Sequence, residues 1–338
     1  IIIPAYNLEN YIAAALQSVL VQTFQDFEII IVDDGSSDET VSIIQSFHDP
    51  RIRLVSQVNG GVSRARNAGM KKAVGAYIAF LDGDDYWYPE HLELAADFFN
   101  RHPEILVYAN RYMRDELEAI PPRPPSYPES IRRLGIRGVL FMHPSSVILN
   151  SSLASRLPPW EEAMPYGEDG LYWTRCMRGT GLIGLGGSVT SIYRQRASSA
   201  MHDEHYQHVS LHSLIAPLLN ELEAMKNPKW QFAVHYLVIR ELHPKRLLSL
   251  NAEERISLTG RIRKIMHPCL NRLFLDSYMK ACSARAGMEQ SFSALMDRTM
   301  FSCKWLDRLE RMGRSLFFRL QTNNGMESKH QDPVRSRS

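Results

Sequence analysis

Cysteine is scarce in this chain of 338 residues, which contains only Cys176, Cys269, Cys282 and Cys303. No two of them form a CxxC pair and no His/Cys cluster has zinc spacing, so the sequence predicts neither a structural zinc site nor a redox-active dithiol. Scattered single cysteines suit a reducing compartment, in which thiols stay free. We therefore expect unpaired thiols, buried as small apolar side chains, and a cytoplasmic protein.

The chain also lacks a strong charge of one sign and a long apolar run. Lysine and arginine total 39 against 37 acidic residues, so the net charge of +2 gives no reason to expect a nucleic-acid partner. No stretch approaches the ~20 continuous apolar residues of a membrane span, and the apolar start Ile1–Pro4 lacks the basic flank and the length of a signal peptide. Because 44% of the residues are apolar, we expect a soluble globular protein that is at most attached to a membrane surface.

Strand-like and helix-like segments alternate over roughly the first hundred residues. Phe27–Val32 is β-branched and almost wholly apolar, as is typical of a central parallel strand. This alternation predicts an α/β fold with a mostly parallel sheet and helices on both faces. The predicted strands are Ile1–Pro4, Phe27–Val32, Ile52–Val55 and Tyr77–Leu81, and the predicted helices are Asn10–Gln22, Glu39–Phe47, Val62–Val74 and Pro89–Arg101.

Polar clusters follow three of these strands. They are Pro4–Asn7, Asp33–Asp38 and Asp82–Asp85. Open parallel sheets bind ligands at the carboxyl ends of their strands, so we expect the three clusters to converge on one site.

The segment Asp82-Gly83-Asp84-Asp85 places three carboxylates within four residues. Such groups repel one another, and hard divalent cations, which prefer oxygen ligands, are the natural compensation. An Asp-rich turn that caps a helix is the competing interpretation. The position directly after a buried strand favours the metal site.

Asp33-Asp34-Gly35 lies at another strand end. A carboxylate there can accept the imide N–H of a uracil-like base, and Tyr6 offers an aromatic face for stacking. A turn followed by a helix cap is the alternative, and the two roles are compatible.

Four segments that stand in order in this sequence resemble the nucleotide-binding half of the inverting family 2 glycosyltransferases, which have the GT-A fold. They are Pro4–Asn7, Val32–Asp38, Gly61–Gly69 and Gly75–Asp85. The resemblance is specific over residues 1–100, weaker to about residue 200, and absent beyond. It implies an α/β, GT-A type sheet flanked by helices, a nucleoside diphosphate sugar as donor, and Mn²⁺ or Mg²⁺ as cofactor.

The resemblance also implies roles for residues of the first half. Pro4 and Tyr6 would lie near the base, Asp34 would bind the uracil edge, and Arg66 would lie near the nucleotide. Asp84 would be the direct metal ligand, and Asp82 would lie near the ribose and the metal.

Residues of the second half resemble the acceptor side of the same family. Asp169 would be the general base that takes the proton from the acceptor hydroxyl, and Glu168 would orient it or touch the acceptor. The alternative for both is acidic charge that favours the N-terminus of a helix. His143 would line the acceptor pocket, and Arg194 and Arg196 would meet the diphosphate, although the family often has His at the position of Arg196.

The pattern changes after Ala109, and this change defines the predicted domains. Residues 1–200 form the glycosyltransferase domain, with a nucleotide-sugar-binding half (1–109) and an acceptor-side half (110–200). Residues 201–321 form a helical C-terminal region, and 322–338 form a disordered tail. Further predicted elements are a proline-rich lid at Pro121–Pro125, strand and turn at Gly138–Leu149, a helix at Gly167–Gly179, and strands at Leu182–Gly187 and Val189–Arg194.

The segment Phe301–Leu320 has apolar residues at helical spacing with basic residues between them. A basic amphipathic helix can lie on anionic lipid, which would give peripheral contact with the inner face of a membrane. A helix packed on its own domain with a solvated basic face is the alternative that we favour.

The predicted function is metal-dependent, inverting transfer of a hexosyl or N-acetylhexosaminyl group from a UDP-sugar. The acceptor would be a saccharide or lipid-linked saccharide in surface-glycan synthesis. A catalytically silent nucleotide-sugar-binding protein on the same fold is the alternative. A dinucleotide-dependent oxidoreductase is disfavoured because no GxGxxG follows the first strand.

Overall fold

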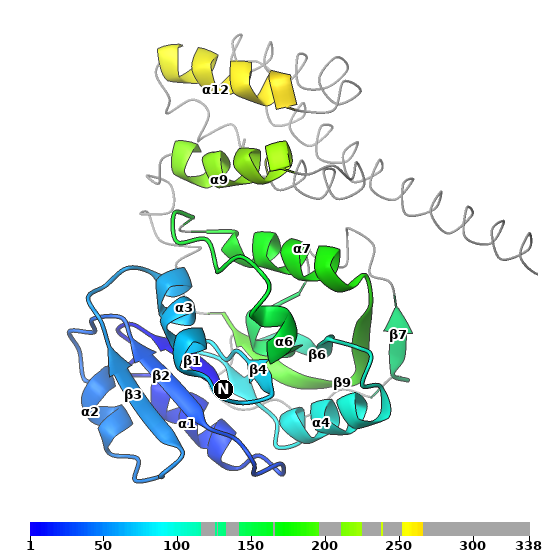
Figure 1. Ribbon diagram of the computed structural model, residues 1–338. Coiled ribbons are helices and arrows are strands. Elements are labelled where there is room, and N and C mark those ends of the chain that lie inside the picture. Colours follow the sequence, from blue (N-terminus) through cyan, green and yellow to red (C-terminus); the bar gives the residue numbers. More distant parts are fainter. Residues whose placement is uncertain are drawn as a thin grey trace, which may run out of the picture.

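A computed structural model of the chain describes residues 1–115, 126, 128–132, 142–164, 166–195, 211–224, 238 and 252–265 (Figure 1). The described residues up to 195 form an α/β body, and helices α9 (Leu211–Ala224) and α12 (Ala252–Ile265) are stacked beyond it. The strands are β1 (Ile2–Ala5), β2 (Ile29–Asp33), β3 (Ile52–Ser56), β4 (Tyr77–Ala79), β5 (Tyr86–Trp87), β6 (Val107–Asp115), β7 (Ser130–Arg132), β8 (Val147–Asn150) and β9 (Ile183–Arg194). The helices are α1 (Ile12–Leu20), α2 (Thr40–Gln45), α3 (Val62–Lys72), α4 (His91–Arg101), η1 (Pro144–Ser146), α6 (Ser151–Ala154), α7 (Glu168–Thr180), α9 (Leu211–Ala224) and α12 (Ala252–Ile265).

The first sheet is parallel, with strand order β1-β2-β3. Because side chains alternate across a strand, Ile29 and Ile31 of β2 pack in the cluster that contains α1, whereas Ile30 and Val32 pack against Ala65 of α3. Helices therefore cover both faces, as predicted, which explains why β2 is buried along its whole length.

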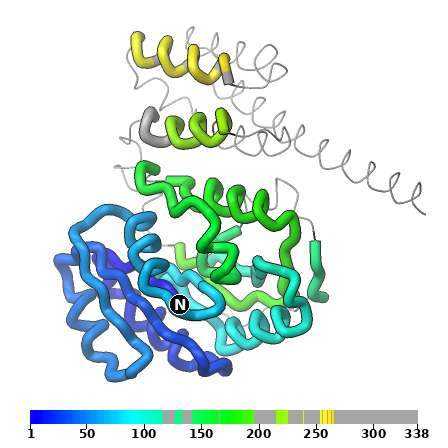
Figure 2. The backbone as a smooth tube through the Cα atoms, viewed as in Figure 1, coloured from blue at the N-terminus to red at the C-terminus, as the bar shows by residue number. Residues whose placement is uncertain are grey.

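The second sheet is mixed, with strand order β4-β8-β6-β9-β5 and β7 paired to β9. β6 and β9 are parallel, and the other pairs are antiparallel. A parallel bridge between Ile2 and Phe80 connects this sheet to β1. The chain start consequently lies at the junction of the two sheets (Figure 2).

Most predicted elements are present, with ends that shift by a few residues. The helix expected at Gly167–Gly179 is α7. The two strands expected at Leu182–Gly187 and Val189–Arg194 are one continuous strand, β9, because its pairing with β6 continues across Gly187 and Ser188 through register shifts. Of Gly138–Leu149, the described part forms η1 and the start of β8.

The described part of the C-terminal region is helical, and Figure 1 shows α7, α9 and α12 stacked one above another. The predicted lid at Pro121–Pro125, the segment Phe301–Leu320, the tail 322–338 and Arg196 lie outside the described residues. Within the residues that are described, no helix combines the length and the apolar character that a membrane span requires.

Gly69 allows α3 to approach β1 closely. A Cβ at this position would lie 2.5 Å from Cγ2 of Ile2, a contact that side chains do not make. Ile2 is fully buried and carries the bridge to the second sheet, so it cannot move aside freely. The small residue at position 69 therefore sets the distance between α3 and the sheet.

We predict that Gly69→Ala destabilises the protein by about 1–3 kcal/mol, because overpacking a core forces side chains and backbone to shift. Gly260→Ala in α12 is the matched control, because a Cβ there meets nothing within 4 Å. It should stabilise by about 0.5–1 kcal/mol through the helix preference of alanine. Urea unfolding of both variants measures the difference, and equal effects would contradict the close packing.

Candidate functional site

The ends of β1 and β2 lie together, as the sequence predicts. The backbone N–H of Asn7 donates to Ser36 Oγ at 3.1 Å, and its side-chain Oδ1 accepts from the Ser37 N–H at 2.9 Å. Asn7 has a positive φ of 51°, a conformation that Asn tolerates better than most residues. The two loops are thus bound to each other at the carboxyl edge of the first sheet. Beside them, Pro4 is buried in β1 and Tyr6 is 49% exposed.

Asp34 fixes the loop that precedes α3. Its carboxylate accepts from Gln57 Nε2 at 2.6 Å, from the Gly60 N–H at 3.0 Å and from the Gly61 N–H at 2.8 Å. Gly61 has a φ of 87°, which favours glycine. A carboxylate can accept about four hydrogen bonds, so a base could add one more donor to these three.

Arg66 is buried between two carboxylates from distant parts of the chain. Its Nη2 donates to Asp82 Oδ1 at 2.7 Å and its Nη1 donates to Glu168 Oε1 at 2.9 Å. Burial opposes the charge of the guanidinium, but Asp82 and Glu168 more than offset it and raise the pKa of Arg66. The arginine therefore stays charged and connects the end of the fourth strand to the start of α7. We call Arg66, Asp82 and Glu168 the Arg66 clamp.

Asp85 is the centre of a second network. The Ser145 hydroxyl donates to Asp85 Oδ2, and the Arg194 backbone N–H donates to Asp85 Oδ1 at 3.0 Å. The Asp82 N–H donates to Ser145 Oγ at 3.1 Å. Burial, followed by the charges of Asp84 and Asp82, raises the pKa of Asp85 well above its usual value. Asp85 thus holds η1 and the end of β9 against the turn Asp82–Asp85, which we call the acidic turn.

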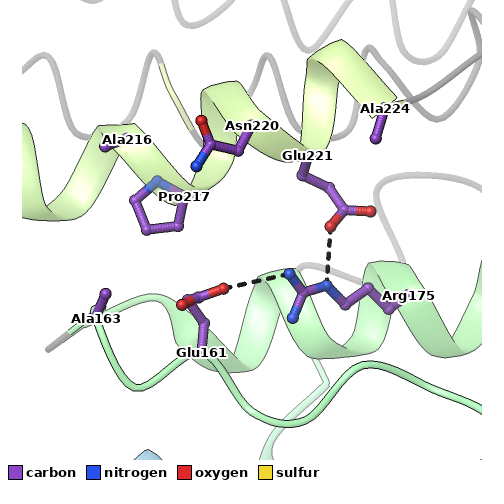
Figure 3. A pocket seen from close by; sticks show the side chains of 8 residues that line it. All are labelled: Glu161, Ala163, Arg175, Ala216, Pro217, Asn220, Glu221 and Ala224. Carbon is purple, nitrogen blue, oxygen red and sulfur yellow. Dashed lines mark hydrogen bonds and ion pairs between the residues drawn. The ribbon is translucent and has the colours of Figure 1, made fainter.

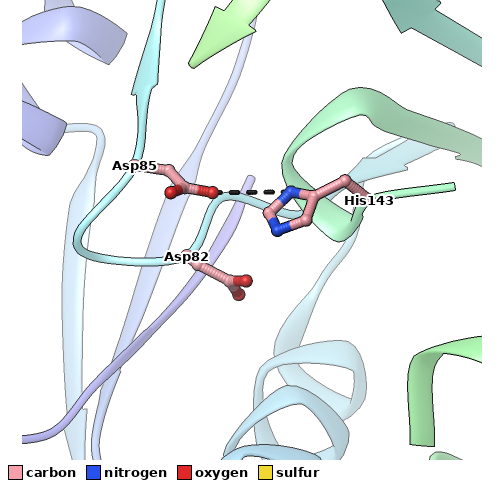
Figure 4. A group of neighbouring side chains, drawn as sticks. All are labelled: Asp82, Asp85 and His143. Atoms are coloured by element: carbon pink, nitrogen blue, oxygen red, sulfur yellow. Dashed lines mark ion pairs between the residues drawn. The ribbon is translucent and has the colours of Figure 1, made fainter. Parts of the chain in front are cut away.

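The geometry extends the predicted metal site. Ligand atoms of Asp82, Asp85 and His143 lie within 4.8 Å of one another (Figure 4). Asp84, the ligand expected from sequence, lies half-buried in the same turn. Three crowded carboxylates share this turn, and oxygen donors of this kind suit Mg²⁺ or Mn²⁺, so the residues fit a divalent cation.

His143, the residue before η1, lies beside Asp85 of the acidic turn. Its Nδ1 accepts from the Ser145 N–H at 3.3 Å and lies 3.5 Å from Asp85 Oδ2. Burial lowers the pKa of His143, which favours the neutral imidazole. Its ring lies 4.4 Å from that of Tyr193.

Glu168 and Asp169 occupy different surroundings at the start of α7. Glu168 is 8% exposed, and burial, with the neighbouring Asp169 charge, raises the pKa of Glu168 to about 7. Asp169 is less buried, and its Oδ1 accepts from the Gly170 N–H at 2.6 Å. Of the two, Asp169 is the carboxylate that a bound molecule can reach.

Arg194 makes contacts that the sequence did not predict. Its Nε donates to the Asp84 carbonyl at 3.2 Å, and its guanidinium lies 5.7 Å from the ring of Tyr11. No pattern in the sequence indicates the contacts of the Arg194 backbone N–H or of the Ser145 hydroxyl, although Ser145 lies two residues after His143.

Comparison with known proteins identifies the family. Residues 1–155 match the model described as "Glycosyl transferase family 2". The chain is 31% identical over 205 residues to WfgD of Escherichia coli, named a UDP-Glc:alpha-D-GlcNAc-diphosphoundecaprenol beta-1,3-glucosyltransferase, in a match that covers 59% of this chain and 78% of WfgD. The chain belongs to glycosyl transferase family 2.

Other relatives of this family match over shorter stretches. The uncharacterized glycosyltransferase EpsJ of Bacillus subtilis is 50% identical over 88 residues, which are 25% of this chain and 26% of EpsJ. The chain spans only 18% to 26% of the length of three relatives that are at least 40% identical to it.

A solved structure shows the same fold. It is Staphylococcus aureus TarS 1–349 in complex with UDP-GlcNAc, with a TM-score of 0.62, 20% identity, and coverage of 89% of this chain and 91% of that one. The predicted α/β, GT-A type family 2 fold is thereby confirmed.

The buried carboxyl of Glu168 predicts a pH-dependent stability. Its pKa is about 7 in the folded protein and near 4.5 when exposed. Between these values the folded state binds more protons than the unfolded state, so the free energy of unfolding falls as pH rises through this window. Glu168→Gln should remove this part of the slope.

Urea unfolding across the same pH range tests the slope. Glu223→Gln is the control, because Glu223 of α9 is exposed. It should leave the slope of the parent protein unchanged. A Glu168→Gln protein with the parent slope would show that the Glu168 carboxyl is not held protonated.

Proposed function

We propose that the chain is a metal-dependent, inverting glycosyltransferase. It transfers a hexosyl or N-acetylhexosaminyl group from a UDP-sugar to a saccharide or lipid-linked saccharide in surface-glycan synthesis. The observation that carries the proposal is the Arg66 clamp, which joins the acidic turn after the fourth strand to the N-terminus of α7. A donor site and a candidate base are thereby brought to one place.

The names of similar proteins support this choice of substrates. WfgD is named for UDP-Glc and for an acceptor on diphosphoundecaprenol. TarS has been solved with UDP-GlcNAc, and a Pyrobaculum calidifontis mannosyltransferase with GDP-Man and Mn²⁺, at a TM-score of 0.52 and 15% identity. A lipid-linked acceptor would bring the enzyme to the cytoplasmic face of a membrane.

The proposed chemistry gives each side chain one role. Tyr6 stacks near the uracil and Asp34 accepts from its imide N–H. Asp82 and Asp84 would hold Mn²⁺ or Mg²⁺, which supplies positive charge against the leaving diphosphate.

Asp169 is the base. It takes the proton of the acceptor hydroxyl while that oxygen attacks the anomeric carbon, and the bond to UDP breaks on the opposite face, so the configuration inverts. We prefer Asp169 to Glu168 because Glu168 is buried and held by Arg66. His143 would line the acceptor pocket, and Arg194 and Arg196 would meet the diphosphate. His143 and the backbone of Arg194 also contact Asp85 and so support the turn.

The proposed domains are those of the sequence. Residues 1–109 bind the donor, residues 110–200 form the acceptor side, and residues 201–321 form a helical C-terminal region. For Phe301–Leu320 we favour a helix packed on its own domain, and contact with a membrane surface is the alternative.

Three isosteric variants test the assignments by their different patterns. Asp169→Asn should lower kcat for a UDP-sugar by about 10²–10⁴-fold, the usual contribution of a positioned base, with little change in donor affinity. Asp84→Asn should abolish the gain in UDP affinity that Mn²⁺ provides. Asp85→Asn is the comparison variant from the same turn. Asp85 is buried and already accepts from Ser145 and Arg194, so this variant should retain the gain if Asp84 is the metal ligand.

Calorimetry of UDP with Mn²⁺ or EDTA, and steady-state hydrolysis of a panel of UDP-sugars, measure these effects. Near-normal kcat in folded Asp169→Asn would remove Asp169 from the mechanism. Loss of the Mn²⁺ gain in Asp85→Asn instead of Asp84→Asn would move the metal to Asp85 and His143. UDP binding without turnover of any donor would favour the silent binding protein.

A further inference from the structure

A short segment that precedes α7 is held by side chains of α3 and α7, and α9 contacts one of those side chains. We call Pro159–Glu162 the strap. Asn67 of α3 is buried and makes two hydrogen bonds to the backbone of the strap. Its Oδ1 accepts from the Trp160 N–H at 2.9 Å, and its Nδ2 donates to the Trp160 carbonyl at 2.9 Å. The same Nδ2 lies 2.9 Å from Glu162 Oε1. This pattern fixes the strap to α3.

Arg175 of α7 holds the strap from the other side. Its Nη1 donates to the Pro159 carbonyl at 3.0 Å and its Nη2 lies 3.4 Å from Glu161 Oε2. Its Nε donates at 2.9 Å to Glu221 of α9, which also pairs with Arg178 at 2.6 Å. Figure 3 shows Arg175 between Glu161 and Glu221 at the edge of a pocket of about 360 Å³. The strap is thus connected to the helical C-terminal region.

The strap carries one large side chain, Trp160, which is 1% exposed. The guanidinium of Arg66 lies over the indole at 4.5 Å, and the ring of Tyr172 stacks on the indole at 4.1 Å with an interplanar angle of 9°. Arg66 Nε is buried and has no hydrogen-bond partner among the described residues. The indole therefore packs on a guanidinium whose Nε–H is buried and has no acceptor among the described residues.

We propose that Trp160 is a positioning residue, and that the strap orients Arg66 so that Asp82 and Glu168 keep the arrangement that catalysis needs. The proposal rests on the proposed function. Two hydrogen bonds leave a guanidinium free to tilt about the line between its two Nη atoms. Contact with a flat indole fixes that plane. The Arg66 side chain is 3% exposed, and the low local dielectric around it strengthens its ion pairs. Helix α9 then supports the site through Glu221 and Arg175, without touching substrate.

Trp160→Leu, Trp160→Phe and Phe98→Leu separate positioning from stability. Leucine keeps an apolar side chain but removes the aromatic face, whereas phenylalanine restores it. Phe98 is the control, because it is equally buried and stacks on Tyr108 at 4.6 Å, in a different core cluster from Trp160.

The first measurement does not depend on activity. It is hydrogen exchange of the Arg66 Nε–H by NMR, assigned by its loss in Arg66→Lys. Because this N–H has no acceptor among the described residues, its protection from exchange with water depends on burial alone. Exchange should be at least about 10-fold faster in Trp160→Leu, since exchange reports local opening, and near the parent rate in Trp160→Phe and Phe98→Leu. Unchanged exchange in Trp160→Leu would overturn the proposal.

The second measurement is kcat and KM for UDP-sugar hydrolysis per folded molecule. Trp160→Leu should lower kcat by about 10–100-fold, the scale of a small misplacement of catalytic groups, while KM for the donor changes little. Phe98→Leu should keep the parent kcat. Faster exchange with an unchanged kcat would overturn the positioning role. If the parent protein turns over no UDP-sugar, the proposed function fails, and the exchange result alone decides whether the strap holds Arg66.

Discussion

The buried guanidinium of Arg66 is the constraint on which the rest of the site depends. Removing a cation from water costs several kcal/mol even after relaxation, and the cost is recovered only where partners of opposite charge are held in good geometry. Asp82 and Glu168 are those partners, at 2.7 Å and 2.9 Å. Each belongs to a different half of the α/β body, so satisfying one buried charge requires both halves to be in register.

The surrounding structure maintains that geometry. Gly69 brings α3, which carries Arg66, close to β1. Asp85, deeply buried, holds the acidic turn against η1 and β9 through Ser145 and Arg194. Asn67, one residue after Arg66, holds the strap whose tryptophan covers the guanidinium. The catalytic chemistry that we propose thus uses few side chains, whereas their placement uses residues from most elements of the body.

The sequence predicts local features of this protein better than distant ones. The strands and helices of the first hundred or so residues follow from apolar periodicity, and the contact between the loops after β1 and β2 follows from their parallel pairing. The acidic turn instead follows β4, which belongs to the mixed sheet and not to the parallel one. The partnership of Arg66 with Glu168 joins residues 102 positions apart, and no spacing rule indicates it. The same holds for Asp85 and Ser145, 60 positions apart. In the sequence Asp85 is one of three neighbouring carboxylates, and only its burial in the structure distinguishes it from Asp82 and Asp84. The mixed second sheet was unexpected because short antiparallel strands such as β5 and β7 carry little periodicity of their own.

A double-mutant cycle on the Arg66 clamp tests the central claim most directly. Arg66→Met leaves the Glu168 carboxyl buried without its cation, Glu168→Gln removes the opposing charge, and the double variant removes both. The unfolding free energies at neutral pH should be non-additive by about 1–3 kcal/mol, as expected for residues in one network, with the double variant more stable than the sum of the single losses predicts. Additive effects within about 0.5 kcal/mol would show that Arg66 and Glu168 do not depend on each other, and that the two halves of the site are assembled by other contacts.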